Sequence, residues 1–145
     1  MTERKYLPTF AELVDRQAIV LLKSIFIPEN REAYLEELKL IEADLDTLLR
    51  SDVFLSGRSV RAILMIMLAN RTIWINESEA RKGGSEQDKL LKLTHSINGC
   101  RNTAKNVLAR AAGQRIDLKI DCLAADLPAD MGNWNVFDAT PNSSD

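Results

Sequence analysis

The amino-acid sequence predicts an all-α protein, an antiparallel four-helix bundle followed by an extended, mostly irregular C-terminal tail. Three observations support this fold class. Apolar residues recur at helical spacing through four segments, and residues that begin or end helices separate these segments. The loops between the segments are short, which favours antiparallel neighbours. The 145 residues therefore divide into a bundle domain, 1–113, and a C-terminal arm and tail, 114–145.

The first two helices are marked by a cap and a proline. Thr9 and Glu12 match a capping box, in which each side chain bonds to the backbone N–H of the other residue, and Pro28 ends the helix that follows. The second helix is expected from about Asn30 to Arg50. Its apolar residues share one stripe at helical spacing: Tyr34, Leu38, Ile41, Leu45, Leu48 and Leu49.

The third helix follows a loop from Asp52 to Gly57 and is capped by Ser56 or Ser59. It ends at Gly83 and Gly84, because glycine readily adopts the left-handed conformation that closes helices. Its first half is apolar almost all round, so we expect it to be the central helix of the bundle.

The fourth helix is expected from Glu86 to about Ala112, with Ser85 as its cap, Asp88 in its first turn and Gly113 at its end.

Beyond the fourth helix, apolar and charged residues alternate from 116 to 122, which is the period of a short half-buried strand. A single strand has no sheet partner within the chain. We interpret it as an arm lying on the bundle or as an edge that pairs with another subunit. In the tail, Trp134, Val136 and Phe137 form an apolar anchor.

Composition narrows the classes of function. The chain is 46% hydrophobic and 28% charged with a net charge of −2, which is globular and makes nucleic acid an improbable partner. Two cysteines without a CxxC motif and a single histidine encode neither a disulfide framework nor a zinc site. The start has no signal-peptide pattern, and the most apolar run, 62–69, is far too short to span a membrane. We expect a cytoplasmic protein without membrane contact.

Charge is divided between two helices. Residues 29–52 hold eight acidic and three basic side chains, whereas residues 85–115 hold six basic and two acidic ones. These faces are expected to attract each other across the bundle or between subunits. The alternative is that the basic face recruits phosphate or nucleic acid.

On the first helix, Asp15 shares a stripe with apolar residues, and a buried carboxylate needs partners. One interpretation is that Glu12 caps the helix and Asp15 pairs with an arginine of another helix. The other makes Glu12 and Asp15 ligands of a divalent cation, with Glu77 completing an acidic cluster. Arg16 borders the same face.

The third helix carries a second polar stripe, formed by Asn70, Trp74, Glu77 and Arg81 at spacings of four, three and four. Its residues suit an ion pair between Glu77 and Arg81 beside a core tryptophan. They equally suit a pocket lined by Asn70 and Glu77 and floored by Trp74.

The fourth helix has an unusual polar edge for a helix, since asparagine is a poor helix former. Its side-chain amides are predicted to bond across the bundle to Asn70 and Asp15, or to read a ligand. The candidate ligand-binding residues on this edge are His95, Asn98, Asn102, Lys105 and Asn106.

Two short stretches resemble small uncharacterised helical proteins of bacteria and phages. Residues 12–16 match an E-L-x-D-[KR] opening, and residues 70–81 match N-x-x-[IL]-W-x-x-E-x-x-x-R. The resemblance implies a helical fold and brings no activity with it.

Glu12 and Asp15 also resemble the E-x-x-D element of the MazG-type all-α nucleoside triphosphate pyrophosphohydrolases, which implies magnesium and a phosphorylated substrate. The E-E-x-x-E element of those enzymes is absent, because Glu36 and Glu37 are not followed by a third glutamate at that spacing.

Two functions follow as expectations. The first is an accessory protein, phage-associated by its resemblance, that acts by binding a protein partner or itself and requires no cofactor. The second is a magnesium-dependent enzyme or sensor for a nucleotide or another phosphorylated small molecule. Its metal ligands would be Glu12, Asp15 and Glu77, with Arg16, Arg81 and Lys105 holding phosphate.

Overall fold

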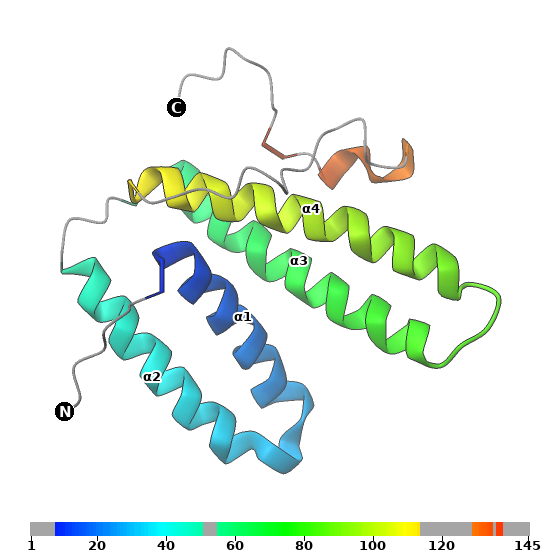
Figure 1. Ribbon diagram of the computed structural model, residues 1–145, viewed down its shortest axis with the longest axis horizontal. Coiled ribbons are helices and arrows are strands. Elements are labelled where there is room, and N and C mark those ends of the chain that lie inside the picture. Colours follow the sequence, from blue (N-terminus) through cyan, green and yellow to red (C-terminus); the bar gives the residue numbers. More distant parts are fainter. Residues whose placement is uncertain (1–7, 51–54, 114–128, 135, 138–145) are drawn as a thin grey trace.

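The computed structural model describes residues 8–50, 55–113, 129–134 and 136–137, and four long helices account for most of them (Figure 1). These are α1 (Phe10–Phe26), α2 (Arg31–Leu49), α3 (Gly57–Arg81) and α4 (Gln87–Ala111), with short 3-10 helices η1 (Pro28–Asn30) and η3 (Ala129–Trp134). The prediction of an all-α four-helix bundle is confirmed. The strand predicted at 116–122 lies outside the described residues.

The helix boundaries follow local chemistry at three of the four starts. The N–H of Glu12 donates to Thr9 Oγ1 at 3.2 Å, and the N–H of Thr9 donates to Glu12 Oε2 at 3.3 Å, which completes the predicted capping box. Pro28 begins η1 and so separates α1 from α2. At α3, the side chain of Ser56 accepts from the N–H of Ser59.

The predicted cap of α4 is wrong. Its N-cap is Glu86, which makes no side-chain capping bond. Gly83 and Gly84 both have positive φ angles, 77° and 105°, and the N–H of Gln87 donates to the carbonyl of Gly84 at 3.3 Å. A backbone turn therefore leads into the helix and takes the role that we had assigned to Ser85.

The four helices form two antiparallel hairpins that lie at an angle to each other (Figure 1). The most extensive helix contact joins α3 to α4, and the next joins α1 to α2. Helix α1 packs on both α3 and α4, whereas α2 has its substantial helix contacts with α1 alone. The acidic helix α2 is thus held on the outside of α1 and is not laid along the basic helix α4.

The main core lies where α1 meets the α3–α4 hairpin. Leu13, Ile66 and Leu108 are its largest fully buried aliphatic side chains. Phe137 of the tail is also buried there, with the Arg58 guanidinium 5.0 Å from its ring centroid. Trp134 is half-buried against the core, while Val136 is exposed, so two of the three predicted anchor residues pack on the bundle.

Helix α3 is only partly the central helix that its composition suggested. Its inner face is buried against α4 and α1. Its outer face keeps Leu64 65% exposed and Leu68 53% exposed. The difference arises because α2 follows α1 outward instead of covering α3. None of the helices in the described ranges is long and apolar enough to cross a membrane.

We predict that Thr9→Ala lowers the free energy of unfolding by about 1 kcal/mol, because it removes a cap from a helix that carries much of the core. The matched control is Thr47→Ala on α2, whose hydroxyl bonds only to the carbonyl of Ala43 within its own helix; alanine there is neutral or slightly stabilising. Urea unfolding followed by circular dichroism measures both, and equal effects would contradict the role of the cap.

Candidate functional site

A network of polar side chains lies where α1, α3 and α4 converge. Asp15 of α1 has only 14% of its side chain exposed. Asn70 of α3 is buried; its Nδ2 donates to Asp15 Oδ1 at 2.8 Å. Arg101 of α4 donates from Nη1 to Asn70 Oδ1 at 2.6 Å. The asparagine amide therefore joins the carboxylate to the guanidinium, using its donor on one side and its acceptor on the other.

Helical periodicity places these three residues inward. Asp15 is one turn from Ala11 and Ala18, both buried, so the stripe that packs α1 on the other helices carries it. Asn70 is one turn from Ile66 and Ile73, and Arg101 is one turn from Ile97 and Ala104, all of which are buried. These three residues therefore lie on the sides of their helices that face the bundle.

The Asp15 carboxylate lies close to two positively charged side chains. Asp15 Oδ1 lies 4.0 Å from Arg101 Nε, and Asp15 Oδ2 lies 3.5 Å from Lys105 Nζ. The cation side chains are 20% and 27% exposed, respectively. Because a partly buried charge costs free energy unless it is paired, Asp15 depends on these partners, and the three groups together keep one excess positive charge.

Neutral amides hold Arg101 in place. Nη1 donates to Asn70 and Nη2 donates to Asn98, three residues earlier on the same helix. Its Nε is buried and has no hydrogen-bond partner within the described part of the chain. Two amides thus fix the guanidinium without neutralising it.

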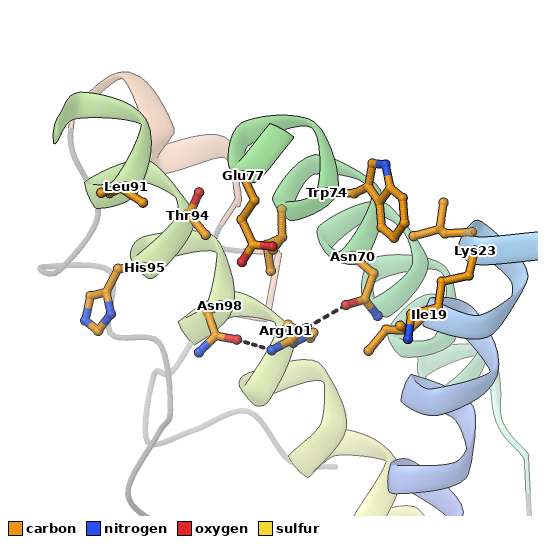
Figure 2. Close-up of a pocket in the computed structure, with 12 residues that line it drawn as sticks. Ile19, Lys23, Asn70, Trp74, Glu77, Leu91, Thr94, His95, Asn98 and Arg101 are labelled. Atoms are coloured by element: carbon orange, nitrogen blue, oxygen red, sulfur yellow. Dashed lines mark hydrogen bonds between the residues drawn. The ribbon is translucent and has the colours of Figure 1, made fainter. Parts of the chain in front are cut away.

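A groove of about 540 Å³ runs beside this network, between the second half of α1, the middle of α3 and the first half of α4. Figure 2 shows Arg101 at its base, between Asn98 and Asn70, with Lys23 reaching in from α1. Twelve residues line it: Ile19, Leu22, Lys23, Asn70, Ile73, Trp74, Glu77, Leu91, Thr94, His95, Asn98 and Arg101.

Four of the predicted ligand-binding residues meet in this groove. Asn70 and Trp74 reach it from α3, and His95 and Asn98 reach it from α4. Glu77 lines it as well, as the pocket interpretation of the third helix expected.

The other predicted ligand-binding residues do not line the groove. Arg16 is exposed on α1, and Arg81 is exposed at the end of α3, where its Nε donates to the backbone carbonyl of Glu77 at 3.3 Å. Asn102 and Asn106 are buried, and Lys105 lies at Asp15. The predicted pairing of the Glu77 and Arg81 side chains is replaced by this bond to the backbone.

The three predicted magnesium ligands lie in three different settings. Glu12 bonds to the backbone at the start of α1, Asp15 faces two cations, and Glu77 lines the groove. In the described ranges, no three Asp, Glu, His or Cys side chains form a group that could hold a metal ion. The interpretation in which Glu12 caps and Asp15 pairs with an arginine of another helix is confirmed.

Sequence reasoning missed the role of Arg101, which it counted only as part of a basic face. Lys23 and Thr94 were missed as lining residues too. One signal was present: Arg101 falls between Asn98 and Lys105 at spacings of three and four, so the three share a helix face.

Comparison with known proteins adds no relative. No protein-family model matches the chain, and no curated protein and no solved structure matches it either.

We predict that Asp15 and Arg101 are energetically coupled. Asp15→Asn should lower the free energy of unfolding by about 1–3 kcal/mol, because it leaves two partly buried cations without their carboxylate. In a double-mutant cycle with Arg101→Met, the coupling energy should be about 0.5–3 kcal/mol. Asp46→Asn, an exposed acid on α2, is the control. Additive effects in urea unfolding would show that the pair contributes nothing to stability.

Proposed function

We propose that the protein acts by association, through a helix of another subunit that packs on the outer face of α3. The observation that carries this proposal is an apolar stripe, here called the outer stripe, formed by Val60, Leu64, Leu68 and Ile75. All four side chains are more than 40% exposed, and Leu64 is 65% exposed. Exposed apolar side chains gathered on one side of a helix mark interaction sites on proteins.

The fold leaves the outer stripe uncovered. Helix α4 packs on the opposite face of α3, and α2 has no substantial contact with α3. A helix that is apolar on two opposite faces is normally covered on both. Each Å² of apolar surface withdrawn from water contributes about 25 cal/mol, so covering the stripe is favourable.

The spacing of the stripe suits a partner helix. Its members follow one another at intervals of four, four and seven residues, so they keep to one side of a straight helix over about 22 Å. The seam of a two-helix contact needs apolar residues at such intervals on each helix. Within the interval of seven, Arg71 is half-buried on the same side of α3, and its guanidinium lies 4.4 Å from the ring centroid of Phe26 on α1.

Charge complementarity supports α3 of a second copy, in antiparallel orientation, as the partner helix. Arg61 and Glu79 are both exposed on α3 and lie eighteen residues, or about five turns, apart, so they flank the stripe on the same side. In an antiparallel pair of α3 helices, one flank of the first copy faces the same flank of the second. The N-terminal end of that flank lies beside the C-terminal end of its counterpart. Arg61 of each copy then lies opposite Glu79 of the other, while the apolar stripes face each other.

We predict that Leu64→Glu weakens self-association about tenfold or more, because it puts a charge into the seam and removes a leucine worth roughly 1.5–3 kcal/mol of burial. Leu40→Glu is the matched control, since Leu40 is 61% exposed on α2, far from the stripe. Sedimentation equilibrium over a range of concentrations measures the mass. A wild-type chain that is monomeric throughout, or equal effects of the two variants, would refute the proposal.

A charge exchange tests the orientation. Arg61→Glu and Glu79→Arg should each weaken the dimer, and the double variant should recover most of the lost affinity, since the pair is restored with its signs reversed. In one copy, Glu79 pairs with Lys82 at 3.0 Å, but both side chains are well exposed and such pairs contribute little. If the double variant is no better than the single variants, the antiparallel arrangement is wrong even where Leu64→Glu weakens association.

A further inference from the structure

We infer that the groove between α1, α3 and α4 binds a small organic anion, namely a flat apolar ring that carries one phosphate or carboxylate group, without a metal ion. The inference is independent of the proposed association. It rests on how Arg101 is held, on a second cation across the groove, and on the apolar wall between them.

The first step concerns the charge of Arg101. Amide oxygens of Asn70 and Asn98 orient its guanidinium. A carboxylate in place of either amide would orient the guanidinium but would also neutralise its positive charge. The carboxylate that it does face, Asp15, is 4.0 Å away and is shared with Lys105. The guanidinium at the base of the groove is therefore fixed in position and incompletely neutralised, which is what an anion receptor requires.

The second step concerns the donors that remain. A guanidinium has five N–H donors. The two amides take one each, and Nε points to the Asp15 side of the network, where it is buried. One N–H of Nη1 and one of Nη2 therefore make no hydrogen bond to a described residue, and Arg101 lines the groove. Phosphate and carboxylate oxygens match such a fork better than neutral acceptors do.

A second cation lies on the opposite wall. Lys23 comes from α1, is half-buried and lines the groove. Its Nζ is 5.9 Å from the Tyr34 ring centroid, a weak contact that a ligand anion can replace. Two positive side chains from different helices thus flank the same space, and a single acidic group between them would be attracted to both.

The apolar residues that line the groove indicate the chemistry of the ligand beyond its acidic group. Trp74, Ile73 and Leu91 line the same groove and supply apolar surface there. An indole face stacks on flat rings, and aliphatic side chains cover their edges. Glu77 stands in the same groove, so a second acidic group on the ligand would be repelled, whereas an N–H of the ring would find an acceptor. The class is therefore a singly acidic, flat molecule.

The test uses the full chain and four probes: phenyl phosphate, benzoate, phenol and inorganic phosphate. The readout is the indole N–H resonance of Trp74 in a ¹H–¹⁵N spectrum, which Trp134→Phe distinguishes from that of the other tryptophan. Phenyl phosphate, benzoate or both should shift this resonance in a saturable way, also in the presence of EDTA. Phenol and inorganic phosphate should not shift it at the same concentration. The two acidic probes show which anionic group is preferred.

Variants link the shift to the groove. Arg101→Gln should weaken binding about tenfold or more, since it removes a charge-assisted contact. Because that variant also disturbs the network, Lys23→Gln provides the second test, with an expected loss of about threefold to tenfold and an unchanged unfolding midpoint. Lys39→Gln on α2 is the control and should bind as the wild type does. Repeating the titration in Leu64→Glu shows that the shift does not come from association.

Several outcomes would overturn the inference. If phenol shifts the Trp74 resonance equally, the groove is an apolar crevice that does not recognise anions. If inorganic phosphate alone shifts it, the groove holds an adventitious ion only. Loss of the shift in EDTA means that a metal ion holds the ligand. No shift with any probe, or full binding by both Arg101→Gln and Lys23→Gln, means that the groove is not an anion site.

Discussion

The carboxylate of Asp15 is the constraint on which the arrangement of the helices depends. It lies on the stripe by which α1 packs, so folding moves a charge out of water at the point where three helices meet. The positive charges of Arg101 and Lys105 on α4 balance that charge, and Asn70 of α3 donates a hydrogen bond to the carboxylate. Apolar packing tolerates small shifts between helices, whereas distances near 3 Å do not. The network therefore fixes how α1 sits on the α3–α4 hairpin.

The groove and the outer stripe both follow from this placement. With α1 lying at an angle across the other hairpin, its second half and the first half of α4 are left as walls on either side of α3 (Figures 1 and 2). Helix α2 is joined to α1 by the short turn at Pro28 and is carried outward with it. The outer face of α3 is consequently left without a neighbour. The polar network and the turn at Pro28 together set the geometry of both candidate surfaces.

The asparagines of α4 show how tertiary contacts can outweigh helix propensity. Each costs a few tenths of a kcal/mol relative to alanine in an isolated helix. Asn98 offsets that cost by fixing Arg101, while Asn102 and Asn106 are buried on the side of α4 that faces the bundle. Their presence indicated that the fourth helix uses its amides for bonding. Which groups they bond to was not readable from α4 alone.

The sequence by itself determined the helices, because their signals are local: the Thr9–Glu12 box, the break at Pro28 and the positive-φ glycines Gly83 and Gly113 act within a few residues. It also determined that Asp15 needed a partner. Only the tertiary structure decided that the partners are Arg101, Lys105 and Asn70 and that Glu77 lies elsewhere. A helical period says which face of a helix is apolar, but not which helix covers that face. For the same reason, the sequence did not show that one side of α3 is exposed, because that exposure depends on how the two hairpins pack.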